Sequence, residues 1–276
     1  MNFLTRLFQR NASVPQSTGV NCPLCHRLCA APTVLGTVAA THPGPFSVAE
    51  YNLVECSDCE VVRLDPIPSA ADLHALYQAS VQFSDAHYTD PEQIERMLAY
   101  YGSCLDNRGL MPAAGETMLE VGAGFAWVAR ACRLRSSAVH TWAQDVTAEC
   151  EKRCPWVDRY MVGMLDVVPR AQQFKLISLT HVIEHLADPG AILADLATRL
   201  TPDGKIFVTA PYRPKGWQSG DGIKPWLDYS YLHVPAHISY LSKRWFTRSA
   251  EQNGLRLLSF DPAHDNGQAF EAILGR

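Results

Sequence analysis

A glycine turn placed directly between an apolar segment and a helical one constrains the fold of this chain most. It lies within Met118-Leu-Glu-Val-Gly-Ala-Gly-Phe-Ala126, with glycines at positions 122 and 124. Glycines let the backbone of such a turn approach a ligand closely, and the following helix offers free N–H groups. A dinucleotide-binding turn would have a third glycine where Trp127 stands, and Glu120 would repel a pyrophosphate. The turn therefore suits a cationic ligand, and a turn that only joins strand to helix is the alternative.

Short apolar segments alternate with helical ones from Glu116 onward. The predicted strands are 117–121, 138–143, 174–180, 205–210 and 255–260. The predicted helices between them are 126–135, 147–153, 189–200 and 242–253. Strands are apolar along their whole length when helices cover both faces of a parallel sheet. The pattern therefore predicts an α/β fold, with a doubly wound, mostly parallel, Rossmann-like sheet.

Two Cys-x-x-Cys pairs, Cys22/Cys25 and Cys56/Cys59, precede this region. The chain has nine cysteines, an odd number, and no secretory signal, so disulfides are a poor default. Four thiolates can close a tetrahedral zinc site that leaves no position open for catalysis. We therefore expect a structural Zn²⁺ bound by these four cysteines in a small zinc-ribbon module. Cys29 is a spare thiol nearby, His26 or His42 could replace a ligand, and a redox dithiol is the rival interpretation.

The length of 276 residues, 47% of them hydrophobic, suits one main domain with a small addition. We expect an amphipathic N-terminal segment at 1–19, the zinc-ribbon module at 20–66 and a helical linker or cap at 67–110. The sheet domain follows at 111–276. An aromatic-rich insertion at 211–236 within it is long enough to form a lid over a site.

The charge pattern excludes several partners. There are 24 Lys and Arg against 28 Asp and Glu, a net charge of −4, so nucleic acid and anionic lipid are not favoured. No apolar run approaches the roughly 18 residues that a membrane span needs. The first ten residues are too interrupted to be a signal peptide. We expect a soluble, cytoplasmic protein with no membrane partner, and the sequence does not indicate its oligomeric state.

With these motifs in this order, the chain resembles the class I S-adenosylmethionine-dependent methyltransferases over about residues 95–276. Glu120-Val-Gly-Ala-Gly124 matches their first motif, and segments 200–211 and 237–242 match later ones. The resemblance implies that Asp145 holds the ribose hydroxyls, that Asp166 holds the adenine amino group, and that the glycine turn faces the amino-acid end. The cofactor-binding residues that it implies are Glu120, Gly122, Ala123, Gly124, Asp145, Val146, Asp166 and His181. The paired cysteines, followed by Pro66-x-Pro68, resemble the start of bacterial methyltransferases of sugar and natural-product pathways.

The segment His181-Val-Ile-Glu-His185 has the text of an inverted zinc-protease motif. That interpretation needs a long helix, but the segment follows an apolar strand and Asp188-Pro189 interrupts any helix, so we reject it. Ligands bind at the carboxyl ends of strands in a doubly wound sheet, which is where Glu184 and His185 fall. His185, with an unperturbed pKa of about 6.5, is then the expected general base. Relatives that methylate sugars use a similar Glu-His pair.

A catalytic divalent metal is the second interpretation of this segment. Plant small-RNA 2′-O-methyltransferases and ubiquinone-pathway O-methyltransferases have Glu-x-x-Glu-His here, and the RNA enzymes add a later histidine and bind a metal. In this chain His181 replaces the first glutamate, and His237 is the candidate for the later histidine. Three histidines and one carboxylate suit a transition metal better than magnesium. Because of the departure at His181, we favour the base.

The acceptor is expected to be a small molecule. Base N-methylation commonly uses an Asn/Asp-Pro-Pro-aromatic motif after the fourth strand, and Thr180-His-Val-Ile183 stands there instead. We therefore expect methylation of oxygen or carbon on a sugar nucleotide or a natural-product intermediate. The alternatives are an RNA methyltransferase that docks through its zinc module, and a non-catalytic scaffold that kept the fold.

Overall fold

The computed structural model describes residues 19–41, 46–79 and 89–276. The predicted N-terminal segment at 1–19 lies outside these ranges apart from its last residue, and so does His42. Within the described ranges, no helix is long and apolar enough to cross a membrane.

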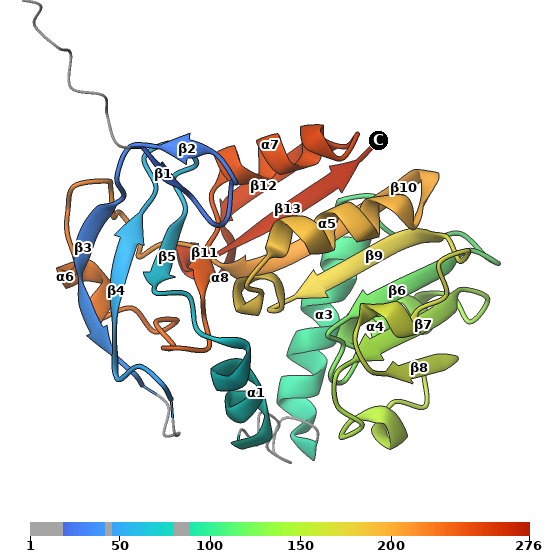
Figure 1. Cartoon of the computed structure of the whole chain (residues 1–276). Helices are drawn as coiled ribbons and strands as arrows, with labels where there is room; N and C mark the ends of the chain where they lie inside the picture. Colours follow the sequence, from blue (N-terminus) through green and yellow to red (C-terminus); the bar gives the residue numbers. More distant parts are fainter. Residues whose placement is uncertain (1–18, 42–45, 80–88) are drawn as a thin grey trace, which may run out of the picture.

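The larger sheet has seven strands in the order β12-β13-β10-β9-β6-β7-β8 (Figure 1). Its parallel strands are β6 (Thr117–Val121), β7 (His140–Asp145), β8 (Arg159–Val162), β9 (Phe174–Thr180) and β10 (Leu200–Pro211). Two further strands, β12 (Arg256–Ala263) and β13 (Ala269–Gly275), are antiparallel. The predicted mostly parallel sheet is confirmed.

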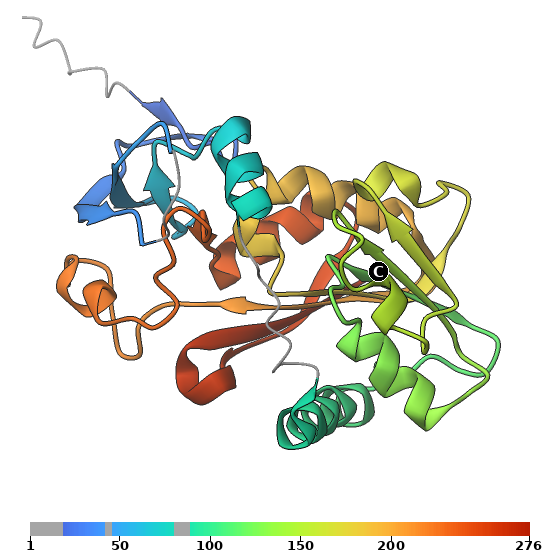
Figure 2. The same cartoon turned by 90° about the horizontal axis from the view of Figure 1, so that it is seen from below.

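Helices cover both faces of this sheet (Figure 2). One face buries Met118 and Leu176 against α3 (Pro91–Asn107) and α4 (Trp127–Arg135). The other face buries Leu119 and Ile177 against α5 (Pro189–Thr198) and α7 (Lys243–Gln252). Consecutive apolar residues on one strand thus face opposite layers, as a doubly wound sheet requires.

Two predictions about local structure are wrong. The segment 147–153, which was predicted to be a helix, contains only a 3-10 turn, η1 (Glu151–Arg153). The Asp145 carboxylate accepts a hydrogen bond from the Thr147 amide just before this turn. Strands β8 and β13 were not expected. The other short elements of this part are η2 (Leu165–Val167), η3 (Ile183–His185), α6 (Lys224–Leu227) and α8 (His264–Gly267).

A second, antiparallel sheet has the order β11-β5-β4-β3, and a two-stranded ribbon, β1-β2, lies beside it. Its N-terminal strands are β3 (Thr33–Ala39), β4 (Glu50–Glu55) and β5 (Val62–Asp65). The ribbon consists of β1 (Val20–Asn21) and β2 (Leu28–Cys29), and α1 (Ala70–Ala79) follows β5. The fourth strand, β11 (Ser239–Tyr240), comes from the C-terminal part of the chain and pairs with β5. The N-terminal sheet is therefore completed by a distant segment.

The aromatic-rich segment at 211–236 is not a free lid. Trp217, Trp226 and Tyr229 are buried in one core with Tyr51 and Leu53 of β4. Strands β3 to β5 leave one apolar face uncovered, and this segment covers it, because large aromatic side chains gain most from burial. The segment also contacts the larger sheet, because the Tyr229 hydroxyl donates to Gln268 O just before β13.

Candidate functional site

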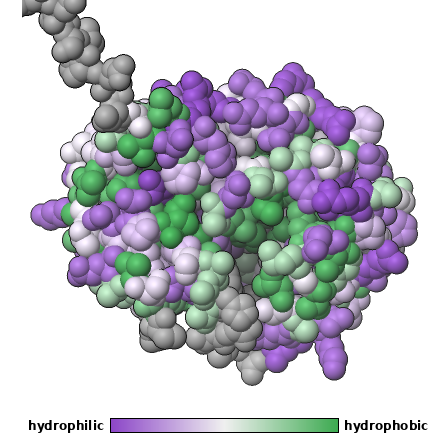
Figure 3. Space-filling view, viewed as in Figure 1, coloured by the Kyte–Doolittle hydropathy of each residue, from purple (hydrophilic) through white to green (hydrophobic). Residues whose placement is uncertain are grey.

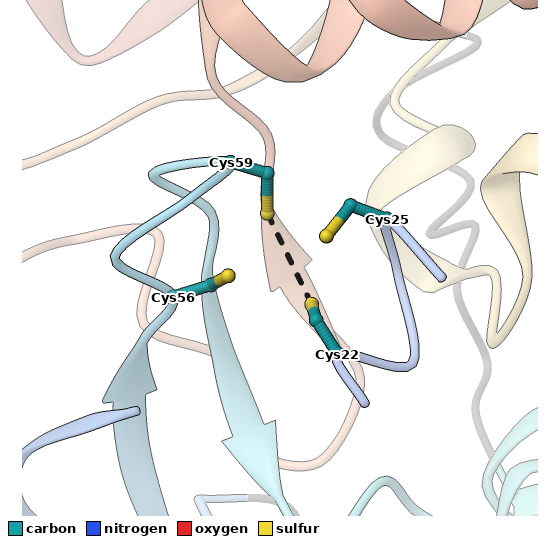
Figure 4. A group of neighbouring side chains, drawn as sticks. All are labelled: Cys22, Cys25, Cys56 and Cys59. Carbon is teal, nitrogen blue, oxygen red and sulfur yellow. Dashed lines mark hydrogen bonds between the residues drawn. The ribbon is translucent and has the colours of Figure 1, made fainter. Parts of the chain in front are cut away.

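Two equivalent turns bring the four paired cysteines together (Figure 4). In the first, the amide of His26 donates to Cys22 O (2.9 Å); in the second, the amide of Glu60 donates to Cys56 O (2.8 Å). His26 and Glu60, each one residue after its pair, both adopt positive φ, at 54° and 60°. One Sγ atom from each of Cys22, Cys25, Cys56 and Cys59 lies within 4.8 Å of the others. The sequence-predicted ligand set thus comes together.

The thiol cluster fits zinc. Tetrahedral Zn–S bonds of about 2.3 Å place sulfur atoms about 3.8 Å apart, and the Cys22 and Cys59 Sγ atoms lie 4.0 Å apart. The hydrogen bond between these two thiols lowers the pKa of Cys22 and raises the pKa of Cys59, so Cys22 is the first of the pair to lose its proton. A fifth sulfur, Cys29 Sγ, lies 3.8 Å from Cys56 Sγ. His26 faces Asp188 instead, with 3.7 Å between Nε2 and Oδ1.

The predicted glycine turn follows β6. Gly122, Gly124 and Ala126 all adopt left-handed backbone conformations, with φ of 60°, 47° and 50°. A β-carbon on Gly122 would lie 2.5 Å from Cγ2 of Val182, so only glycine fits beneath the loop that follows β9. The turn and the His181–His185 loop are therefore in contact.

Glu120 caps a helix. Its carboxylate accepts hydrogen bonds from the amides of Val128 (3.3 Å) and Ala129 (2.9 Å), at the start of α4. The N-cap residue, Ala126, provides no side-chain cap, so Glu120 takes that role. Burial raises the pKa of Glu120 to about 8. Its contact with a cofactor stays a prediction.

Asp145 and its neighbours lie at the carboxyl ends of β7 and β8, where cofactor binding was predicted. Asp145 ends β7, and its Oδ2 accepts from the amide of Gly124 at 2.8 Å. The end of β8 is tied to this point, because the amide of Gly163 donates to Asp145 O (2.8 Å). The exposed Asp166 and two exposed apolar residues, Val146 (49%) and Met164 (68%), follow these strands. A carboxylate beside exposed apolar side chains at the carboxyl ends of parallel strands suits a ribose and an adenine.

The second cluster is built around Glu184. This side chain is 0% exposed, and neither of its carboxylate oxygens has a hydrogen bond. Its Oε1 lies 3.5 Å from His181 Nδ1 and 3.9 Å from His185 Nε2. Glu184, His185 and His237 each place one ligand atom within 4.8 Å of the other two. The four residues expected to be catalytic are thus brought together from the loop that follows β9, which includes η3, and from the segment before β11.

The histidine tautomers follow from backbone contacts. His185 Nδ1 lies 2.8 Å from Ala236 O, and His237 Nδ1 lies 2.7 Å from Tyr231 O. Because a carbonyl oxygen only accepts, both Nδ1 atoms are protonated, so Nε2 is the nitrogen of each ring at which a proton can be gained or lost. Burial lowers the pKa of His237 to about 3, so this ring is neutral.

Opposing effects act on the pKa of Glu184. Burial raises this pKa, whereas the neighbouring His181, His185 and His237 lower it, and the net direction is a lowering. A buried carboxylate beside imidazole rings can take part in proton transfer or hold a cation.

Sequence reasoning missed some residues of this cluster. His233 stacks on His237, with ring centroids 4.8 Å apart, and Tyr231 stacks on His181 at 5.9 Å. His233 and His237 are four residues apart, a spacing that would place both on one face of a helix. Pro235 between them argues against a helix, so the spacing alone did not predict that they lie together. The carbonyl groups of Tyr231 and Ala236 have no sequence signal.

Comparisons with known proteins agree with the fold. Residues 86–259, more than half of the chain, match a family described as a methyltransferase domain. The structure is similar to an O-methyltransferase family protein from Burkholderia thailandensis, with a TM-score of 0.53 and 12% identity over 74% of this chain and 62% of that one. The mitomycin 7-O-methyltransferase has a TM-score of 0.49 and 17% identity over 72% of this chain and 62% of that one. An S-adenosylmethionine-dependent methyltransferase from Mesorhizobium loti has a TM-score of 0.48 and 15% identity over 65% and 100%.

The chain spans less than two thirds of the length of the first two proteins. The comparison with curated proteins found no match. At these identities the solved structures show the fold alone, and the family match shows the methyltransferase family. The chain belongs to the methyltransferase-domain family and is a class I S-adenosylmethionine-dependent methyltransferase.

Proposed function

We propose that this protein methylates an oxygen or a carbon of a small molecule that binds beside His181, Glu184, His185 and His237. The observation that carries the proposal is the position of His185, whose Nδ1 is held by Ala236 O while its Nε2 lies beside the buried Glu184. This cluster contacts the glycine turn through Val182. The face drawn in Figure 3 is hollowed between the two sheets, with apolar residues around the hollow. A sugar nucleotide or a natural-product intermediate is the proposed acceptor class.

S-adenosylmethionine would be held at the carboxyl ends of β6, β7 and β8. The glycine turn at 122–124 offers its backbone, Asp145 a carboxylate for the ribose, and Val146 and Asp166 the surroundings of the adenine. When bound, this cofactor supplies an electrophilic methyl group on its sulfonium. The protein contributes alignment, exclusion of water and removal of one proton.

His185 is the proposed general base. Its Nδ1 is fixed by Ala236 O, so Nε2 is the only ring atom able to accept a proton. The resulting imidazolium would lie 3.9 Å from Glu184 Oε1, and the buried anion would stabilise it. The proton thus moves from the acceptor to Nε2 of His185.

A catalytic divalent metal is the second candidate, and one observation favours it. Both oxygens of Glu184 are buried without hydrogen bonds, while the Nδ1 atoms of His185 and His237 are tied to carbonyls. Metal-bound histidines are usually held in this way through their second nitrogen. With His181, these residues would hold a transition-metal ion, which would supply Lewis acidity to an acceptor hydroxyl.

We also propose a structural zinc at the Cys22, Cys25, Cys56 and Cys59 cluster. It is closed by four thiols and leaves no position for an acceptor. We also propose that the protein is cytoplasmic. The net charge of −4 gives no support to the alternative RNA acceptor.

Incubation of a cell extract with the protein and methyl-labelled S-adenosylmethionine tests the proposal. We expect mass spectrometry to find a labelled small molecule that is absent with the Asp145→Ala variant. Label found in RNA alone would contradict a small-molecule acceptor and support the RNA methyltransferase alternative. Cofactor binding without any labelled product would favour a non-catalytic scaffold and contradict the proposal.

A further inference from the structure

The segment before β11 is held by the N-terminal sheet. Thr41, just after β3, binds Val234 through three contacts: its amide donates to Val234 O (2.8 Å), its Oγ1 donates to the same oxygen (3.2 Å), and its Oγ1 accepts from the Val234 amide (2.9 Å). The amide of Leu64 in β5 donates to Ile238 O at 2.9 Å. One end of the segment 234–238 is thus held by the residue that follows β3, and the other end is held by β5.

The residues between these two ends face the catalytic cluster. Ala236 O accepts from His185 Nδ1 (2.8 Å), and the next residue, His237, is itself a member of the cluster. The amide of Ile238 donates to the backbone oxygen of Glu184 at 2.8 Å. Five consecutive residues therefore contact the N-terminal part of the chain at their ends and the proposed acceptor site at their centre.

The two turns that contain the cysteine pairs contact α7, which follows β11. Ser242, the N-cap of α7, donates from Oγ to Cys59 O, and Trp245 Nε1 donates to Leu24 O at 2.7 Å. Arg248 contacts the Asp58 carboxylate at 2.6 Å. The segment with His237 is thus anchored before it by Thr41 and after it by the thiol cluster.

We infer that the N-terminal module positions the catalytic histidines, with Thr41 as the positioning residue. Thr41 fixes Val234, and through it the Ala236 carbonyl that selects the Nδ1-protonated tautomer of His185. The Nε2 lone pair then faces Glu184 and the acceptor. This inference rests on the proposed function of His185, and it gives the small module a part in catalysis besides holding zinc.

Three variants separate positioning from stability. Thr41→Val removes both side-chain contacts at nearly unchanged volume, and Thr41→Ser keeps the hydroxyl. Thr37→Val is the matched control, because Thr37 lies in β3, the strand that ends just before Thr41, and its hydroxyl donates to Asn52 Oδ1 instead (3.2 Å). Thermal unfolding of Thr41→Val and Thr37→Val is expected to change by similar amounts.

The tautomer of His185 is measured by ¹⁵N NMR of the full chain with S-adenosylhomocysteine added, its signal identified by its absence in His185→Gln. We expect Nδ1-protonated His185 in the wild type, Thr41→Ser and Thr37→Val, and a shift toward the Nε2-protonated form in Thr41→Val. With an acceptor, kcat of Thr41→Val should fall about 10-fold to 100-fold, with the KM of the cofactor unchanged.

A wild-type tautomer in Thr41→Val overturns the inference, and so does an equal shift in Thr37→Val. A shifted tautomer in Thr41→Val, together with no methyl transfer by the wild type to any acceptor, is a different result. It would refute the proposed function while leaving the structural link from Thr41 to His185 established.

Discussion

Val182 lies directly over Gly122, so close that a β-carbon on the glycine would come within 2.5 Å of Val182 Cγ2. Two residues after Val182 comes the buried Glu184, and then His185. The turn expected to bind the cofactor and the loop expected to bind the acceptor therefore share one contact. A change at this contact should affect both ligands.

Gly122→Ala is expected to lower the affinity for S-adenosylhomocysteine at least about 10-fold, or about 1.4 kcal/mol. The new β-carbon must displace either the turn or the loop, and φ of 60° already disfavours alanine. Calorimetric titration measures the affinity. Gly115→Ala is the matched control: Gly115 also has positive φ, at 82°, but its β-carbon would meet nothing within 4 Å. Equal losses in both variants would assign the effect to backbone strain rather than to Val182.

Asp145→Ala should also weaken binding of S-adenosylhomocysteine by about 10-fold or more. A hydrogen bond from a ribose hydroxyl to a charged acceptor is worth about 1.5–3 kcal/mol. Asp203→Ala serves as the control in the same titration. Asp203 lies near the amino end of β10, whereas Asp145 lies at the carboxyl end of β7, so the two residues are at opposite ends of the parallel strands. Unchanged affinity in Asp145→Ala would remove this residue from the cofactor site.

Purified protein should contain about one zinc per chain by elemental analysis. The Cys22→Ser/Cys56→Ser double variant should lose the zinc and unfold more easily, because a closed thiolate site supplies folding free energy. Cys29→Ser is the control and should keep the metal, although its sulfur lies only 3.8 Å from Cys56. Zinc retained in the double variant but lost in Cys29→Ser would show a different ligand set.

The buried Glu120 should make stability depend on pH. Burial raises its pKa from 4.5 to about 8 in the folded protein. Between these values the folded state holds a proton that the unfolded state has released, so the free energy of unfolding falls as pH rises. The loss should be on the order of a few kcal/mol. Urea unfolding without cofactor at pH 5 and pH 8 measures it.

Glu120→Gln should show a smaller loss of stability between pH 5 and pH 8 than the wild type. Glu95→Gln, at an exposed position of α3, is the control and should behave as the wild type does. The same pH dependence in Glu120→Gln and in the wild type would contradict the raised pKa.

The sequence predicts the sheet well where the pattern is local. Strands β6 and β9 are apolar runs and lie where their periodicity placed them. Strand β13 was missed because Glu271 interrupts its apolar run. This carboxylate is buried against Arg108, at 2.5 Å, and that partner lies far away in the sequence. A contact of this kind has no local signature.

The site divides in the same way. Residues at strand ends, such as Asp145 and Glu184, could be predicted because topology places them on the ligand edge. The contact between His185 and the Ala236 carbonyl could not, because any residue supplies a carbonyl group. The length of the aromatic insertion can be read from the sequence and suggests a lid. The apolar face of β3 to β5 that the insertion covers cannot be read from the sequence.

The two roles open to His185 predict different results in a variant series. Under the base interpretation, His185→Ala lowers turnover by about 10²-fold to 10⁴-fold and leaves cofactor affinity nearly intact. His181→Ala and His237→Ala are then milder, because neither accepts the proton. Under the metal interpretation all three losses are similar, and a chelator abolishes activity that added divalent ion restores while the thiol-bound zinc remains. Full activity of His185→Ala would refute both roles and leave alignment of cofactor and acceptor as the source of catalysis.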